Sequence, residues 1–409
     1  MTDHAPAIAY LTDAEGMWSK VESFCRDNPV VRLDDAGALH VAPGGLFVFG
    51  GDTVDRGPYG LRIVRALVDA KRRQPDQVVL LAGNRDINKL RLARELSGET
   101  HRRAPPEASG WSRPEMLRFL LEHTMGAKGA FEHRRAELMR DGGKATDADV
   151  VESYLADITP DGPLFTYLSM ARLAFRAGVT LFVHGGVTDA SFGVVPAAPS
   201  RGVPALRTAD LEAWLSGLET FYRDELSAFV DGGPYDALVA YQAPVSGTRL
   251  NQASVVYGRP ADDLNNPVLL PEGLREALAS QGIFRVIMGH TPVGDVPCVL
   301  RDRNRTLEQV SADCSRGRHD DAPCVLVRGD VLEVRGVAIL DDGERVDHSA
   351  TFDARADASP LGTVLAGSGH SVRSRTADGR YVAARLFPGF RTEQLALSPD
   401  DLERRASVE

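Results

Sequence analysis

Short apolar runs recur along this chain, and each of them stops at glycine or at polar residues. Runs of four to six apolar residues that end at turn-forming residues are typical of buried strands. Such runs stand at 7–12, 45–49, 77–81, 179–183 and 284–288. Between them, the spacing predicts helices at 17–27, 58–73, 209–230 and 271–280. Strands that alternate with helices predict a mixed α/β fold.

The stretch from about residue 87 to 175 differs because it shows no clear strand pattern. Its apolar residues favour helices at 114–124, 130–140, 147–158 and 164–175. We interpret it as a helical insertion or cap between strands. Such a cap could shape the access of substrate or have a purely structural role, and the sequence leaves both alternatives open. After residue 324, apolar and polar residues alternate as in antiparallel strands. The pattern predicts a main domain over 6–340 and a small β-rich C-terminal extension over 341–409.

Composition and charge narrow the class of protein. The 409 residues are 43% hydrophobic and 25% charged, as in globular proteins. The net charge of -10 argues against a chain that coats nucleic acid, although it leaves room for a local phosphate pocket. The four cysteines lack C-x-x-C spacing and are typical of reduced thiols. Without a signal-peptide or membrane-spanning pattern, we expect a cytoplasmic protein with no membrane partner, export as an effector being left open.

Side chains of metal-ligand type follow each of the five apolar runs. They are Asp13 with Glu15, Asp52, Asn84, His184 and His290. Ligand sites of open α/β sheets lie at the carboxyl ends of the strands, so we expect these side chains to lie together. Carboxylate, amide and imidazole groups are common ligands of divalent cations. One such turn would be ordinary structure, whereas five in one chain favour a metal site.

The turn at 50–57, Gly-Gly-Asp-Thr-Val-Asp-Arg-Gly, adds a basic group to the carboxylates. Its glycines allow a tight turn just after the strand. Asp52 and Asp55 are then held at a rigid edge of the sheet beside Arg56. Two carboxylates and one arginine in this place predict a site for a metal and a phosphate group.

In their order, the five turns resemble the motifs of the calcineurin-like metallophosphoesterases, most closely the phosphoprotein phosphatases. The matching stretches are D-A-E-G at 13–16, G-D-T-V-D-R-G at 51–57, G-N-R-D at 83–86, H-G-G at 184–186 and G-H-T-P at 289–292. G-N-R-D in the third motif resembles a bacterial effector-type branch of the family. The resemblance covers about 6–340 outside the insertion, and it implies a β-sandwich flanked by helices.

The resemblance also implies a centre of two divalent metal ions. Asp13, Glu15 and Asp52 would hold the first ion, and Asp52 would bridge to a second ion whose other ligands would be Asn84, His184 and His290. A hydroxide between the ions would attack phosphorus in line. Glu15 stands where the family has a histidine, so the first site is all-carboxylate. We therefore expect Mn²⁺, with Mg²⁺, Fe or Zn²⁺ as alternatives.

The phosphate contacts and the proton donor are the second part of the implied site. Arg56 would bind the substrate phosphate, and Arg259 stands about where the family has a second arginine. Arg85 replaces the histidine that protonates the leaving group, and arginine stays charged at any working pH. Arg85 could instead pair with Asp55, the implied orienting residue, and clamp the phosphate. Candidates for the missing acid are Asp86 and His319.

These observations predict a metal-dependent phosphatase that hydrolyses phosphomonoesters on phosphoproteins, at Tyr or Ser/Thr, or small phosphoesters. Loss of the acid favours good leaving groups such as the tyrosine phenolate, whose pKa is about 10. One alternative is hydrolysis of dinucleoside polyphosphates or other nucleotides. A second alternative is an inactive binding module that keeps its metals.

Overall fold

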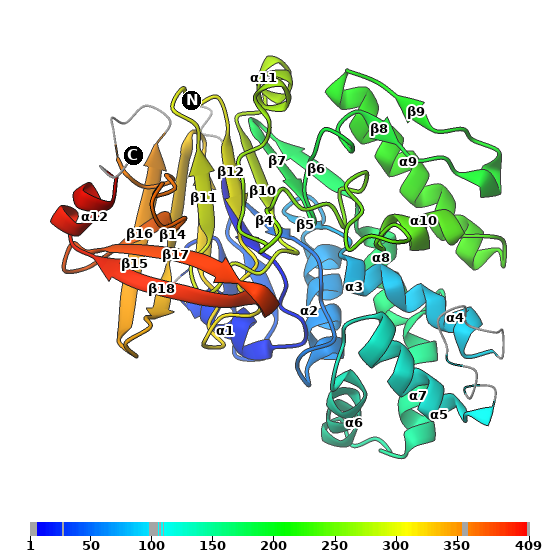
Figure 1. The fold of residues 1–409 in the computed structure, drawn as a ribbon. Coiled ribbons are helices and arrows are strands. Elements are labelled where there is room, and N and C mark those ends of the chain that lie inside the picture. The colour runs from blue at the N-terminus through cyan, green and yellow to red at the C-terminus, as the bar shows by residue number, and fades with distance from the viewer. Residues whose placement is uncertain are drawn as a thin grey trace.

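The computed structural model describes residues 6–26, 28–97, 105, 108, 110–353 and 359–406, and over these residues two large sheets and their helices form the fold (Figure 1). Among the described residues, the larger sheet has the order β18 (Arg391–Leu397), β17 (Tyr381–Phe387), β16 (Ser371–Thr376), β15 (Arg345–Asp353), β14 (Val331–Ile339), β13 (Cys324–Arg328), β1 (Ala7–Leu11), β4 (Gly45–Phe49), β5 (Val78–Leu80). The smaller sheet has the order β11 (Cys298–Arg301), β12 (Glu308–Ser311), β10 (Arg285–Met288), β7 (Thr180–Val183), β6 (Ala174–Ala177). The predicted mixed α/β fold with two packed sheets is confirmed.

An apolar core joins the two sheets. Tyr10 and Val48 of the larger sheet and Phe182 and Ile287 of the smaller one belong to the same buried cluster. The rings of Tyr10 and Phe182 lie with their centroids 5.7 Å apart. The alternate residues of β1 and β4, such as Phe47, belong to a second cluster with the helices. Burial on both faces explains why these strands are continuous apolar runs in the sequence.

The strand directions bring the five polar turns to one region. β1 pairs with β4 in parallel, and β4 pairs with β5 in parallel. In the smaller sheet, β10 is parallel to both β7 and β12. The carboxyl ends of these strands therefore share an edge in each sheet, as parallel pairing requires.

Helices pack beside the sheets and make most of the insertion. They are α1 (Trp18–Arg26), α2 (Gly60–Arg73), α3 (Asn84–Ile87), α4 (Leu92–Glu95), α5 (Arg113–Phe119), α6 (Ala130–Arg140), α7 (Asp147–Asp157), α8 (Pro163–Met170), α9 (Leu211–Val230), α10 (Asp236–Tyr241), α11 (Glu272–Ser280) and α12 (Pro399–Ala406). In Figure 1 the helices α4 to α7 form a lobe at the lower right. No helix in the described ranges is long and apolar enough to cross a membrane.

The helical prediction for 164–175 is wrong at its end. α8 stops at Met170, and Ala174–Ala177 forms β6, which pairs antiparallel with β7. Phe175 pairs with Phe182 across this ladder and packs against the inter-sheet core. Tertiary pairing therefore outweighs the local helical spacing. The described chain also has two small hairpins. One pairs β2 (Val31–Leu33) with β3 (Leu39–Val41), and the other pairs β8 (Val194–Val195) with β9 (Leu206–Arg207).

The C-terminal strands continue the larger sheet. The predicted boundary at residue 340 falls in the turn between β14 and β15, and these two strands pair over their whole lengths. β17 and β18 form a hairpin whose turn is the short helix η5 (Pro388–Phe390). In Figure 1 this hairpin, coloured red, crosses the front of the molecule, with its turn at the end away from α12.

Candidate metal centre

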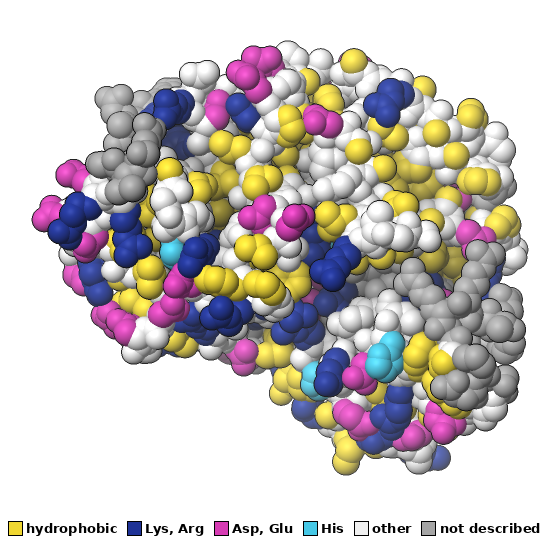
Figure 2. All heavy atoms as spheres, viewed as in Figure 1, with side chains coloured by type: hydrophobic (Ala, Val, Ile, Leu, Met, Phe, Trp, Pro, Cys, Tyr) yellow, Lys and Arg dark blue, Asp and Glu magenta, His cyan; other side chains and the backbone are white. Residues whose placement is uncertain are grey.

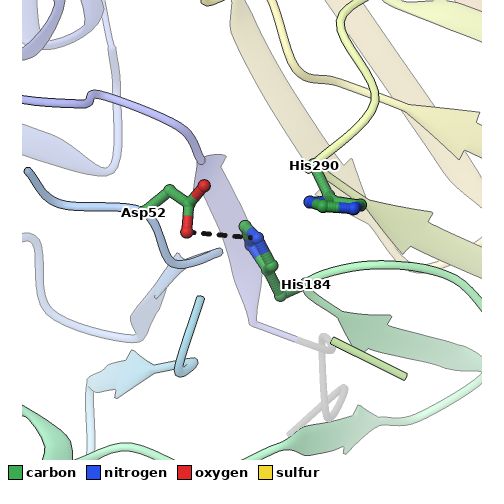
Figure 3. A group of neighbouring side chains, drawn as sticks. All are labelled: Asp52, His184 and His290. Carbon is green, nitrogen blue, oxygen red and sulfur yellow. Dashed lines mark ion pairs between the residues drawn. The ribbon is translucent and has the colours of Figure 1, made fainter. Parts of the chain in front are cut away.

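The six predicted ligand residues lie together at the ends of β1, β4, β5, β7 and β10. Single ligand atoms of Asp52, His184 and His290 all lie within 4.8 Å of one another, and so do those of Asp13, Glu15 and Asp52. Figure 3 shows the first group, whose side chains come from three separate segments and face a common space. Asp52 belongs to both groups, as the bridging role predicted for it requires.

The backbone at this centre is held in an unusual conformation. Asp13, Glu15, Asp52, Asp55 and His290 all have positive φ, between 46° and 108°. This region is uncommon for residues other than glycine, and it costs of order 1–3 kcal/mol for each residue. Strain of this kind persists where the surrounding structure fixes it, and it clusters at functional sites. The five strained residues coincide with the polar turns found in the sequence.

Two glycines let the turns approach one another closely. A Cβ on Gly83 would lie 2.2 Å from the Oδ1 atom of Asp52, and a Cβ on Gly289 would lie 2.2 Å from the Oδ2 atom of Asp13. Neither distance is compatible with a side chain. Glycine is therefore required at both positions for the ligands to converge.

The histidines present neutral nitrogen atoms to the centre. Nδ1 of His184 donates to the carbonyl oxygen of Gly50 (2.7 Å), so its lone pair is on Nε2. That Nε2 lies 3.3 Å from Asp52 Oδ1 and 3.2 Å from Asn84 Oδ1. Burial lowers the pKa of His184 to about 3, and it lowers the pKa of His290 well below its usual value. Nε2 of His290 is buried and has no hydrogen-bond partner among the described residues.

Four carboxylates crowd the same space. Asp13, Glu15, Asp52 and Asp313 are all buried. Burial raises the pKa of Asp13, and the neighbouring Asp313, Asp52 and Glu15 raise it further. Negative groups this close need positive charge beside them; Arg85 and Arg56 supply part of it at Glu15, and the imidazoles with their free lone pairs add none. The donor set therefore fits divalent cations, which carboxylate, amide and imidazole groups can share.

Asp313 was not among the predicted residues. It follows β12, which runs parallel to β10, so its carboxylate reaches the same edge as His290. The signal in the sequence is weak, because the β12 segment Glu308–Ser311 has one charged and two polar residues and a single valine in place of an apolar run. Because the sequence does not predict this strand, it also gives no reason to expect a ligand in the turn that follows it.

The two arginines of the motifs lie beside the carboxylates. Nε of Arg85 is 2.5 Å from Glu15 Oε1 and 3.4 Å from Asp52 Oδ2, and its Nη1 is 3.4 Å from Asp55 Oδ2. Burial alone would lower the pKa of Arg85, but Glu15, Asp55 and Asp52 outweigh it and raise the pKa. Arg56 donates to Glu15 (3.2 Å) and to the carbonyl of Ser315 (2.9 Å). Glu15 is therefore shared between two arginines and the first candidate metal position.

Lys89 is a further charged residue that sequence reasoning missed. Its ammonium group is buried and donates to Asp55 Oδ2 (2.8 Å), to the carbonyl of Arg85 (3.0 Å) and to Asn88 Oδ1 (2.9 Å). Asp55 is thus oriented by two cations, Lys89 and Arg85. The spacing Arg85-x-x-x-Lys89 places both on one side of the turn that begins with α3.

Neither candidate for the proton donor lines the pocket in the described part of the chain. Asp86 is fully buried behind the centre, and its oxygens accept hydrogen bonds from the backbone amides of Asp52, Thr53 and Gly83. Asp86 therefore links the turns by hydrogen bonds from behind the centre. This corrects the prediction that Asp86 is a catalytic residue. His319 contacts the carbonyl of Val337 through Nε2 (2.9 Å) and also lies outside the pocket.

The pocket over the centre has a basic wall. Arg259, predicted from position alone, lines it together with Arg85, Arg91 and Arg316. Nε of Arg259 is buried without a hydrogen-bond partner, while its Nη1 donates to Asn265 (3.2 Å). Figure 2 shows Lys and Arg side chains gathered near the middle of this face. The arrangement brings the candidate metal ligands and a group of arginines into one cavity.

Comparison with known proteins supports the family suggested by the motifs. Residues 33–188 match the model of the calcineurin-like phosphoesterases. No curated protein sequence matches the chain. Among solved structures, a cold-active protein-tyrosine phosphatase of a psychrophilic Shewanella species is 15% identical, with a TM-score of 0.47 over 84% of this chain and 80% of that chain. A protein serine/threonine phosphatase from Saccharomyces cerevisiae is 12% identical, with a TM-score of 0.38 over 88% of this chain and 83% of that chain.

At this level of similarity, neither solved structure says anything about the substrate of this chain. The family match spans Asp52, Asn84 and His184, and the fold brings Asp13, Glu15 and His290 to them from outside the matched segment. Residues 33–188 are therefore similar to the calcineurin-like phosphoesterases, the family whose motifs the five turns resemble.

Proposed function

We propose that this protein is a metal-dependent phosphoric-ester hydrolase that cleaves phosphomonoesters on phosphoproteins. The observation that carries the proposal is the shared cavity, in which buried carboxylates and neutral imidazoles face a wall of arginines. Hydrolysis of a phosphomonoester needs both halves of this cavity. The arginines bind the anionic phosphoryl oxygens, and metal ions held by the carboxylates and imidazoles would make the phosphorus electrophilic.

Each half of the site has named residues. Asp52, Asn84, His184 and His290 would hold one divalent ion, and Asp13, Glu15 and Asp52 would hold a second, with Mn²⁺ as the first choice. Such ions would activate water and neutralise charge on the phosphoryl group. Arg56, Arg85 and Arg259 would hold the phosphate oxygens, since a guanidinium donates two parallel hydrogen bonds.

The positions of the charged residues favour an orienting role for the network around Asp55. Asp55 fixes Arg85 from one side, and Glu15 fixes it from the other. Lys89 holds Asp55 in turn. Arg85 is therefore pre-organised to receive phosphate charge as it develops, which is the form of stabilisation that contributes most in such sites.

An assay series tests the proposal. Hydrolysis of p-nitrophenyl phosphate, of phosphotyrosine and phosphoserine peptides and of diadenosine tetraphosphate is measured with Mn²⁺, with Mg²⁺ and after chelation. We expect metal-dependent turnover of the phosphomonoesters and loss of both turnover and metal binding in Asp52→Asn. Preferred cleavage of diadenosine tetraphosphate would replace the proposal by a nucleotide hydrolase. Absence of any turnover with metal bound would leave a binding module.

A further inference from the structure

The turn of the β17–β18 hairpin reaches the cavity of the metal centre. Phe390, the last residue of η5, lines this cavity together with Asp13, His290 and Arg259. Among the described lining residues, Phe390 and Tyr257 are the two that carry a phenyl ring. The C-terminal strands therefore supply a side chain to a site whose six predicted ligands all come from the first 290 residues.

Phe390 lies among cations and close to the metal ligands. The guanidinium carbon of Arg316 is 5.2 Å from the centroid of the Phe390 ring, and that of Arg259 is 5.7 Å from it. Arg259 also lies 5.8 Å from the ring of Tyr257, whose centroid is 4.8 Å from that of the His290 ring. A short series of contacts thus joins His290, Tyr257, Arg259 and Phe390.

The conformation of Phe390 costs free energy that the hairpin has to supply. Its φ is +61°, and the preceding Gly389 has a φ of +77°. A bulky residue in this region is an outlier, and such residues persist where a function or a rigid surrounding holds them. The seven paired residues on each side of the turn provide that rigid surrounding. Glycine would adopt this backbone conformation without strain, so the local structure alone does not explain why a phenylalanine stands here.

We propose that Phe390 is a specificity-determining residue that selects aryl phosphates, with its ring and that of Tyr257 packed against an aromatic leaving group. The inference rests on the proposed phosphatase function. A ring bonded directly to the phosphate oxygen stays beside the phosphate, and the arginines of the cavity lie beside the Phe390 ring, Arg316 at 5.2 Å and Arg259 at 5.7 Å, whereas a nucleobase stands one sugar farther from its phosphate. Arg259 and Arg316 would then hold the phosphate end while their other faces stay on the aromatic rings.

The chemistry of the site agrees with this selection. As the oxygen of water bonds to phosphorus, the P–O bond to the ring breaks, and its electron pair leaves on the phenolate. The phenolate takes its proton from solvent, and its pKa of about 10 lets it leave without an acid. An alkoxide is a much poorer leaving group, and in the described cavity Arg85 occupies the place where the resemblance implies a proton donor.

The inference is tested first by binding. With Mn²⁺ present, the affinities for phenylphosphonate and methylphosphonate are measured by competition or calorimetry in the full chain and in Phe390→Ala. We expect the variant to bind phenylphosphonate about tenfold more weakly and methylphosphonate unchanged, because a lost ring contact and its buried area are worth about this much. Equal changes for the two ligands, or no change for phenylphosphonate, would overturn the inference.

Two further variants control for structure. Phe390→Gly removes the ring and the backbone strain together, so it should keep or raise the melting temperature while it loses the same selectivity. Phe387→Ala is the matched control at the other end of the turn, since Phe387 contacts Arg385 and Arg391 and does not line the described cavity. Loss of phenylphosphonate affinity in Phe387→Ala as well would show a general loosening of the hairpin and refute the assignment.

Turnover separates this inference from the function on which it rests. In Phe390→Ala, kcat/KM should fall for p-nitrophenyl phosphate and a phosphotyrosine peptide and stay constant for a phosphoserine peptide. Turnover with an unchanged ratio would refute the aromatic subsite alone. If no substrate is turned over but phenylphosphonate still binds through Phe390, the hydrolase function fails and the subsite stands. A larger effect of the variant on AMP than on phosphotyrosine would assign the ring to a nucleobase and overturn the aryl selection.

Discussion

Replacing Arg85 with glutamine removes the cation that three carboxylates share. The side chain is 13% exposed, and that of Glu15 is 4% exposed, so the pair behaves as a mostly buried one. Breaking a buried ion pair from one side costs about 3–5 kcal/mol, because the other charge is left uncompensated. We take about 3 kcal/mol for Arg85→Gln, since Lys89 still holds Asp55 and Arg56 still holds Glu15.

The double-mutant cycle with Glu15→Gln isolates the pair. Without Glu15, Arg85 keeps only its longer contacts of 3.4 Å to Asp52 and Asp55. Two residues in direct contact should couple by about 2 kcal/mol, which corresponds to roughly a thirtyfold change in the folding equilibrium constant. The double variant should therefore be less destabilised than the sum of the two single variants.

The assay is urea unfolding of the metal-free protein, followed by tryptophan fluorescence, for the wild type and the three variants. Titration with Mn²⁺ is the second readout. Arg85→Gln should bind Mn²⁺ at least about tenfold more tightly, since removal of one positive charge near the carboxylates favours a cation there by more than about 1.4 kcal/mol. Additive unfolding free energies together with an unchanged Mn²⁺ affinity would refute the view that Arg85 neutralises the first metal position.

Three other outcomes follow from contacts elsewhere in the structure. Gly289→Ala should abolish metal binding, because its Cβ would meet Asp13 Oδ2 at 2.2 Å, whereas Gly273→Ala in α11, with nothing within 4 Å, should leave metal titrations unchanged. Lys89→Met should lower the unfolding free energy by about 3 kcal/mol, because it leaves the buried Asp55 with only its longer contact to Arg85, and a melting temperature equal to that of the wild type would contradict this. His348, buried in β15, has a pKa lowered to about 4 by burial, so the unfolded chain takes up its proton first as the pH falls below about 6.5. This costs the wild type about 3 kcal/mol between pH 7 and pH 4, and His348→Leu should be spared that loss when unfolding is measured at both pH values.

The convergence of the candidate ligands could be predicted from sequence because two local signals coincide at each of them. An apolar run with both faces buried marks the strand, and a glycine-containing turn marks its end. Asp52 and His184 each directly follow such a run or its glycines, and the parallel pairing of the strands then brings them together. The apolar runs and their turns are therefore enough to predict that these side chains converge.

Residues whose place depends on long-range pairing could not be found in the same way. β12 and β18 contain charged and polar residues, and each is a strand because a neighbour in the sheet pairs with it. Asp313 follows the first of these strands, and Phe390 precedes the second. Neither residue has a local signal, since its position at the cavity is set by partners that are far away in the sequence.

Glu15 and Arg85 show most clearly what the structure adds. In the sequence they are two separate departures from the family pattern, one that makes the first metal site all-carboxylate and one that removes an acid. In the structure the two side chains form one ion pair with a distance of 2.5 Å, so each departure accounts for the other. A histidine at position 15 would leave Arg85 with less negative charge around it, and a histidine at position 85 would leave Glu15 with one cation fewer. The pair is therefore best understood as a single exchange, in which a carboxylate that can hold either a metal or an arginine allows Arg85 to stand where the resemblance implies a proton donor.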